Sequence, residues 1–231
     1  VPSDQEGPGF PGRRLLIRAG IADTQAALDT FRQCSSRGMS RGIAEAVTGA
    51  LVHACDPDTA LYAVGQLYAR DETREALPST VQPNSDDVWG RLVKTLGASK
   101  RIGSMVEQDA DLLSSVTGEY FSSSTWDKGM RADAFSAAAS CGGNETAAVN
   151  ALRHEYWKQI IAVAAFDMAH NDPAGIQPEV SSYISDLVDC ALDAAVQIAL
   201  RSVGASEDIL FSVIGMGKLG ARENNYGPDV D

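Results

Sequence analysis

The sequence has few residues of the kinds that build disulfide frameworks or zinc sites. It has only four cysteines and three histidines, and neither a C-x-x-C pair nor a zinc-ligand spacing occurs among them. The cysteines lie far apart in the chain, at Cys34, Cys55, Cys141 and Cys190. Disulfide-stabilised secreted domains are usually shorter and denser in cysteine. We therefore expect reduced thiols in a cytoplasmic protein.

Positive charge and long apolar runs are also scarce. Lys and Arg number 19 against 31 Asp and Glu, so the formal net charge is -12. This field repels phosphate backbones, and we expect no nucleic-acid partner. The longest apolar stretch, 160–166, is too short to span a bilayer, so we expect no membrane partner either. An anionic nucleotide would still bind through a local cradle of amides, a lysine or a metal ion.

Helical periodicity dominates the chain from residue 14 to residue 204. The first 13 residues are rich in Pro and Gly without the apolar centre of a signal peptide, and we interpret them as a flexible lead-in. Capping residues predict where the helices start. The helix whose apolar stripe begins at residue 88 is expected to end at Gly97, in a left-handed conformation. The predicted caps are Asp23 or Thr24, Asp56 followed by Pro57, Ser99 and Asp109.

The second half of this helical region has a weaker pattern at first and then two long helices. Between residues 114 and 150 we expect loops and a short helix around 131–139. Long helices are predicted over 145–169 and 178–204, the latter ending at Gly204.

Beyond residue 205 the pattern changes. The apolar run "ILFSVIG", 209–215, has strand length and β-branched residues, so we predict a buried strand. We therefore expect a helical domain over 14–204 and the first elements of an α/β or α+β domain over 205–231.

Three glycines follow this predicted strand in the G-x-G-x-x-G spacing: Gly215, Gly217 and Gly220. A dinucleotide-binding interpretation fits badly, because a helix would last two turns at most before Gly227 and Pro228. The competing interpretation adds Asp229 and Asp231, which a second strand would project from one face toward Mg²⁺. The glycine turn and Lys218 would then approach phosphate groups. The simplest alternative is that 229–231 form a polar turn with no catalytic or binding role.

The stretch "GMGKLGARENNYGPDVD" resembles a motif of the glutamine synthetase adenylyltransferase family, also called adenylyl-removing enzymes. That motif is G-x-G-K-L-G-x-x-E-L-x-x-x-S-D-x-D, and the family belongs to the DNA polymerase β-like nucleotidyltransferases. The matching residues are Gly215, Gly217, Lys218, Leu219, Gly220, Glu223, Asp229 and Asp231. The segments 96–113 and 151–169 are similar to upstream parts of the family, in the context of the first of its two nucleotidyltransferase halves.

The resemblance implies a mainly α fold, in which a helical domain is followed by the first strands of a polymerase β-like α+β nucleotidyltransferase domain. It implies an enzyme that attaches AMP from ATP to a tyrosine of glutamine synthetase and removes it with orthophosphate, releasing ADP. Asp229 and Asp231 would be catalytic and hold Mg²⁺, while Gly215, Gly217, Lys218 and Gly220 would bind nucleotide or phosphate. Glutamine synthetase and a nitrogen-regulatory signalling protein are the implied partners.

The sequence departs from the family pattern at two positions and ends within it. Pro228 replaces the family's serine, and Asn224 replaces a leucine or methionine. Polymerase β-like sites also need a third carboxylate from a later strand, so we expect these 231 residues to be inactive alone. Two other hypotheses stay open: a helical module that docks glutamine synthetase or a regulator, and a nucleotidyltransferase with another substrate.

Overall fold

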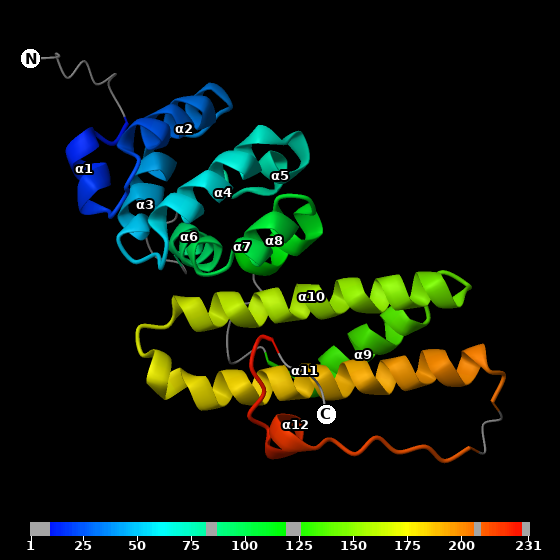
Figure 1. Ribbon diagram of the computed structural model, residues 1–231. Helices are drawn as coiled ribbons and strands as arrows, with labels where there is room; N and C mark the ends of the chain where they lie inside the picture. The colour runs from blue at the N-terminus through cyan, green and yellow to red at the C-terminus, as the bar shows by residue number, and fades with distance from the viewer. Residues whose placement is uncertain (1–9, 82–86, 119–125, 206–208, 228–231) are drawn as a thin grey trace, which may run out of the picture. The chain divides into compact units, whose positions relative to one another are not determined.

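The computed structural model describes residues 10–81, 87–118, 126–205 and 209–227. Within these ranges all regular secondary structure is helical (Figure 1), which confirms the mainly α expectation. The chain divides into two compact units, Val1–Phe121 and Ser122–Asp231. Among the described residues, no helix is long and apolar enough to cross a membrane.

The first unit packs around one central helix. Its helices are α1 Arg13–Arg18, α2 Thr24–Ser36, α3 Arg41–Leu51, α4 Pro57–Ala69, α5 Asp71–Ala76, α6 Val88–Ala98, α7 Lys100–Val106 and α8 Ala110–Thr117. Helix α6 contacts α3, α4, α7 and α8. It buries Trp89, Leu92 and Leu96 almost completely. Helix α6 thus places its apolar stripe against its neighbours, as the periodicity predicts.

The predicted caps are present at the helix starts. Asp23 accepts hydrogen bonds from the amides of Gln25 and Ala26, and Asp56 accepts one from Thr59. The Ser99 hydroxyl and the Asp109 carboxylate cap α7 and α8 in the same way. These bonds satisfy amides that have no partner within their helix, so these helix starts are confirmed.

Gly97 does not have the role that the sequence predicted for it. It lies inside α6, which continues to Ala98, and its φ is not left-handed. A Cβ at this position would lie 3.0 Å from the Cβ of Ala54 and 3.1 Å from the Asp56 carbonyl oxygen. The glycine therefore permits close packing of α6 against the start of α4 and does not end the helix.

Arg91 is a buried cation that holds the end of α8. Its Nε donates to the Val116 carbonyl at 2.7 Å, and Nη2 donates to the Gly118 carbonyl at 3.3 Å. These carbonyls belong to the last turn of α8 and the residue after it, where the helix supplies no further amide donors. We expect Arg91→Met to lower the free energy of unfolding by about 2 kcal/mol, because charged hydrogen bonds are lost while the apolar stem is kept.

Urea unfolding followed by circular dichroism measures this loss. The matched control is Arg41→Met, which breaks an exposed pair with Glu45 and should cost under about 0.5 kcal/mol. Equal losses for the two variants would contradict the role assigned to Arg91.

The second unit is built from three helices and a short fourth one. They are α9 Lys128–Ala139, α10 Glu145–Ala169, α11 Pro173–Ser202 and α12 Gly217–Ala221. Helices α10 and α11 form an antiparallel hairpin, and α9 packs on both (Figure 1). Their facing sides bury an apolar core. It includes Phe135, Ile161, Ala165, Ile184, Leu187 and Ala194.

The long helices agree with the sequence prediction apart from one boundary. Helix α10 spans the predicted 145–169, but α11 begins at Pro173, five residues before the predicted start. Asp172 caps this earlier start, and Pro178 lies inside the helix. The predicted end is confirmed, since Gly204 follows α11 with a φ of 62°.

The segment predicted as a buried strand differs from that prediction. Residues 209–216 form neither helix nor strand, and their apolar side chains are exposed, Leu210 by 99% and Ile214 by 81%. A strand needs a neighbour for its backbone hydrogen bonds, and the described residues offer none. The proposed domain boundary near residue 205 therefore stays a prediction.

Candidate functional site

The three motif glycines meet in one compact turn, and each has a local reason to be glycine. Gly217, the first residue of α12, has a φ of 53°. A Cβ on Gly220 would lie 2.6 Å from the Gly215 carbonyl oxygen, and one on Gly215 would lie 2.9 Å from Cγ of Leu219. The spacing therefore reflects a turn that closes on itself, with Gly220 against the backbone of Gly215.

The turn ends at an unusual residue. Arg222 has a left-handed backbone with a φ of 59°, the one positive φ outside glycine in the described ranges. Its amide donates to the Leu219 carbonyl, and the Glu223 amide donates to the Lys218 carbonyl at 2.8 Å. A left-handed conformation costs an ordinary residue about 1–2 kcal/mol. The contacts of the Arg222 side chain must offset this cost.

Those contacts are ion pairs with helix α11. The Arg222 guanidinium lies 2.6 Å from an Asp186 carboxylate oxygen and 3.4 Å from one of Asp189. Lys128, at the start of α9, binds the same two carboxylates at 3.0 and 2.9 Å. We call these four residues the Asp186 network. Two cations and two carboxylates balance their charge, and the network ties the glycine turn to α9 and α11.

The pKa values of Asp186 and Lys128 are shifted toward the charged forms. Burial acts to raise the pKa of Asp186, but hydrogen bonds from Arg222 and Lys128 outweigh it and lower that pKa below its ordinary 3.8. The hydrogen bond to Asp189, together with that to Asp186, raises the pKa of Lys128 above its ordinary 10.5. Both shifts mean that the folded state favours the ionised network.

This shift predicts an acid-sensitive attachment of the turn. A lowered folded pKa gives stability that is present above the unfolded value of 3.8 and is lost as the pH falls through the folded value. We therefore expect the wild type to lose stability more steeply than Asp186→Asn does as the pH falls from 3.8 through the folded pKa of Asp186. Urea unfolding at a series of acidic pH values measures this, and parallel curves for the two proteins would contradict it.

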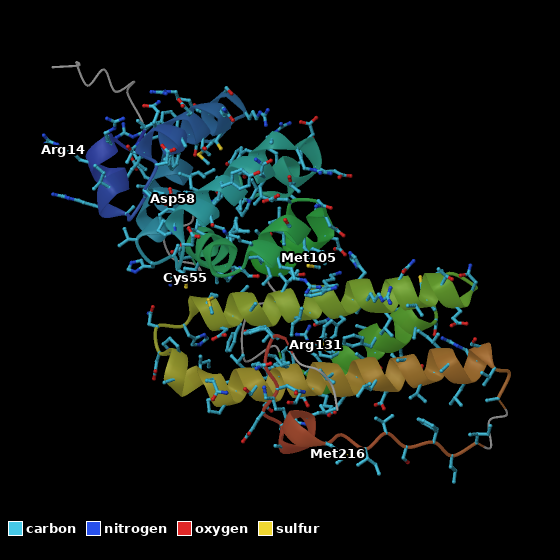
Figure 2. All side chains as sticks on the ribbon, in the orientation of Figure 1. Arg14, Cys55, Asp58, Met105, Arg131 and Met216 are labelled. Carbon is cyan, nitrogen blue, oxygen red and sulfur yellow. The ribbon has the colours of Figure 1, made fainter. Side chains whose placement is uncertain are left out.

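Asp186 also contacts the aromatic interior of the second unit. The indole Nε1 of Trp126 lies 3.4 Å from the other Asp186 oxygen, and its ring stacks on Tyr183 at 4.2 Å. The buried Arg131, which is labelled in Figure 2, has its guanidinium 4.7 Å from the centre of the Trp126 ring. Arg131 in turn donates to Gln159 on α10 at 2.7 Å.

Other side chains near the turn pack on the helices as well. Leu219 is buried, and the Tyr226 hydroxyl donates to Asp167 on α10 at 2.9 Å. Asn224 is only 1% exposed, and its amide Nδ2 has no hydrogen-bond partner among the residues that the structure describes. A polar amide thus occupies a buried position where the family motif has an apolar residue. Chain segment 217–226 is held by packing and charge on both long helices.

The predicted site residues divide into two groups. The structure brings together Gly215, Gly217 and Gly220, and it exposes Lys218 beside them. Asp229 and Asp231, the predicted metal ligands, lie outside the described residues, so the Mg²⁺ site stays a prediction. No group of three or more potential metal-ligating side chains occurs in the part of the chain that is described.

The sequence prediction did not identify the Asp186 network. One signal was available, because Asp186 and Asp189 stand three residues apart on a helix whose neighbouring positions, Ile184, Leu187 and Val188, are apolar. Two carboxylates at that spacing share one helix face, and next to an apolar stripe they indicate cationic partners from another element. The identity of those partners depends on the tertiary fold.

A separate pocket lies at the C-terminal end of α11. It has a volume of about 320 Å³ between the α9–α10 loop and the C-terminal end of α11. Arg201 lines it and already donates to the Ala139 carbonyl, while Ser202 is bonded to Glu145. None of the predicted site residues lines this pocket. It is therefore separate from the glycine turn.

Comparisons with known proteins identify the family of this chain. The family model of glutamate-ammonia ligase adenylyltransferase matches residues 89–231, from α6 through the glycine turn. No solved structure matches the chain.

Several curated proteins named bifunctional glutamine synthetase adenylyltransferase/adenylyl-removing enzyme are similar to the chain. The one from Bifidobacterium longum (strain NCC 2705) is 34% identical over 96% of this chain and 21% of its own length. The one from Leifsonia xyli subsp. xyli is 32% identical over 79% of this chain and 19% of its own. That of Mycolicibacterium smegmatis is 44% identical over 37% of this chain and 9% of its own. The chain spans about a fifth of the length of the relatives that it matches over most of its own length. It belongs to the glutamate-ammonia ligase adenylyltransferase family.

Proposed function

We propose that this chain supplies the first part of a nucleotidyltransferase site that acts on glutamine synthetase. One observation carries the proposal: the family model matches residues 89–231, a range that includes the glycine turn and ends at Asp231. The turn has the compact geometry that its motif requires, and the Asp186 network holds it on α11. By full-length enzyme we mean a protein that contains this sequence and is as long as the relatives.

The proposed reaction is adenylyl transfer in two directions. In attachment, the tyrosine hydroxyl of glutamine synthetase attacks the α-phosphorus of ATP, and pyrophosphate leaves. In removal, an oxygen of orthophosphate attacks the α-phosphorus of AMP-tyrosine. The bond to the tyrosine oxygen then breaks, ADP forms, and the tyrosine regains a proton. We assign removal to the half of the enzyme to which this chain belongs.

The chain's own residues would bind and orient the phosphate groups. The backbone at Gly215 and Gly217 carries no side chain that would keep phosphate away from its amides, and Lys218 adds an exposed positive charge. Gly220, whose amide donates to the Met216 carbonyl, would serve the phosphate site by closing the turn. Asp229 and Asp231 would hold Mg²⁺, which stabilises charge on the attacking and leaving oxygens when bound. Strands beyond the glycine turn would complete the polymerase β-like domain.

Location and regulation are part of the same proposal. The four cysteines form no disulfide, and two of them, Cys55 and Cys141, are exposed thiols, which suits a reducing cytoplasm. A nitrogen-regulatory signalling protein is the proposed source of control over the two directions. The 231 residues alone are proposed to be inactive, because the third carboxylate of the site would come from a later strand.

The test supplies adenylylated glutamine synthetase, orthophosphate and Mg²⁺ to the full-length enzyme and to the 231-residue chain. ADP should form with the full-length enzyme and not with the shorter chain. Loss of AMP from glutamine synthetase, followed by intact mass spectrometry, provides the matching readout. A full-length enzyme that binds glutamine synthetase but never releases ADP would refute the removal activity.

A pull-down separates this function from the docking-module hypothesis. Glutamine synthetase should be captured by the full-length enzyme whether or not Asp229 and Asp231 are replaced, while ADP formation should require both carboxylates. If adenylyl transfer persists without them, the chemistry lies elsewhere and this chain only docks.

A further inference from the structure

The Asp186 carboxylate receives three donors from two parts of the chain. Trp126 precedes α9, Lys128 begins α9, and Arg222 follows α12, and all three approach the Asp186 carboxylate within 3.4 Å. The Asp186 side chain is only 13% exposed. A carboxylate that is buried to this degree persists only when its lone pairs are satisfied, and here the protein itself satisfies them.

Asp186 and Asp189 are not equivalent. Asp189 is 37% exposed and lies 3.4 Å from Arg222, whereas Asp186 lies 2.6 Å from the same guanidinium. The shorter, less solvated pair is the stronger one, since water screens the exposed carboxylate more. Asp186 is therefore the main anchor, and Asp189 adds a weaker contact.

The glycine turn depends on this anchor for its place on the helices. Helix α12 has five residues and buries one side chain, Leu219, and the exposed segment 209–216 precedes it. A helix this short has little stability of its own. Arg222 also fixes the end of the turn through its left-handed backbone. Its ion pair with Asp186 couples that backbone geometry to α11.

We propose that Asp186 is a positioning residue of the nucleotidyltransferase site, which holds the phosphate-binding glycine turn in place through Arg222. This inference rests on the proposed function. Asp186 does not touch substrate. It fixes the backbone on which phosphate is bound, and the aromatic stack of Trp126 and Tyr183 keeps its carboxylate in position.

The test is a kinetic double-mutant cycle in the full-length enzyme, with Asp186→Asn, Arg222→Gln and both together. Each single variant should lower kcat/KM for orthophosphate in ADP formation about tenfold, and the double variant should be no worse than either. Asp193→Asn, an exposed carboxylate on the same helix, is the matched control and should leave kcat/KM unchanged. Arg222→Lys should recover part of the loss, because it keeps the charge.

Hydrogen–deuterium exchange gives a second readout that does not depend on activity. Peptides covering 217–226 should exchange faster in Asp186→Asn than in wild type or Asp193→Asn, while peptides from the middle of α10 should be unchanged. Arg222 is 44% exposed, so Arg222→Gln compared with wild type and Arg222→Lys keeps the inference testable if Asp186→Asn unfolds.

The outcomes separate this inference from the proposed function. If wild type forms ADP while Asp186→Asn and Arg222→Gln match the Asp193→Asn control, the inference is wrong and the function stands. Additive losses in the double variant would also overturn it, because the two residues would then act independently. A wild type without ADP formation overturns both.

Discussion

Replacing Asp229 or Asp231 by asparagine in the full-length enzyme is expected to lower kcat for adenylyl removal by about a thousandfold. Asparagine keeps the shape of the side chain but removes the charge that Mg²⁺ needs from its oxygen ligands. A metal ion in such a site supplies several kcal/mol of charge stabilisation to the transition state. Initial rates of ADP release, with orthophosphate and adenylylated glutamine synthetase at saturation, measure the effect.

The matched control is Asp133→Asn, which changes an exposed carboxylate on α9. It should retain the wild-type rate. Melting temperatures of all three variants should equal that of the wild type, because each change replaces a carboxylate by an amide of the same shape. Full activity of Asp229→Asn would place the metal site on other residues.

Gly220→Ala is expected to lower kcat/KM of the full-length enzyme by about a hundredfold with little change in the stability of the helices. The new Cβ would lie 2.6 Å from the Gly215 carbonyl oxygen, and a backbone atom cannot move aside as a flexible side chain does. The turn must therefore open, which displaces the amides proposed to bind phosphate. A misplacement of about 1 Å costs catalysis about this much.

A graded series tests the geometric cause. Gly215→Ala should cost less than Gly220→Ala, because its Cβ meets the movable side chain of Leu219. Gly42→Ala, in the exposed part of α3 with nothing within 4 Å, should keep full activity. The same rate for Gly220→Ala and Gly42→Ala would mean that the turn does not bind the substrate.

Much of the helical architecture follows from local chemistry that the sequence displays. Asp56 before Pro57, Ser99 and Gly204 predicted their helix boundaries because a cap needs only a few neighbouring residues. The glycine turn was recognisable for a similar reason, since its motif is six residues long. Its steric origin, a glycine packed on a carbonyl five residues away, required coordinates.

Features that depend on distant partners were not predictable in the same way. Gly97 resembles a helix terminator, but its role comes from Ala54 and Asp56, which approach it from another part of the fold. The apolar run 209–215 has the composition of a strand, yet a strand forms only against a neighbour. The Asp186 network joins residues up to 94 positions apart, from Lys128 to Arg222. Its partners are set by the packing of α9, α11 and α12.

Asn224 is a residue that the sequence singles out but the structure does not explain. The sequence shows it as a departure from an apolar position of the family motif, and the structure shows that the position is buried. Its Nδ2 has no partner among the described residues. Nothing in the described structure explains why an amide is kept there.

The most direct test of the central claim follows the atoms of orthophosphate. The full-length enzyme is incubated with adenylylated glutamine synthetase, Mg²⁺ and orthophosphate labelled with heavy oxygen, and the nucleotide product is analysed by mass spectrometry. We predict ADP whose β-phosphoryl group carries the label, formed by the wild type and formed far more slowly by Asp229→Asn and Gly220→Ala. Release of AMP in place of labelled ADP, or no release of nucleotide at all, would contradict the account.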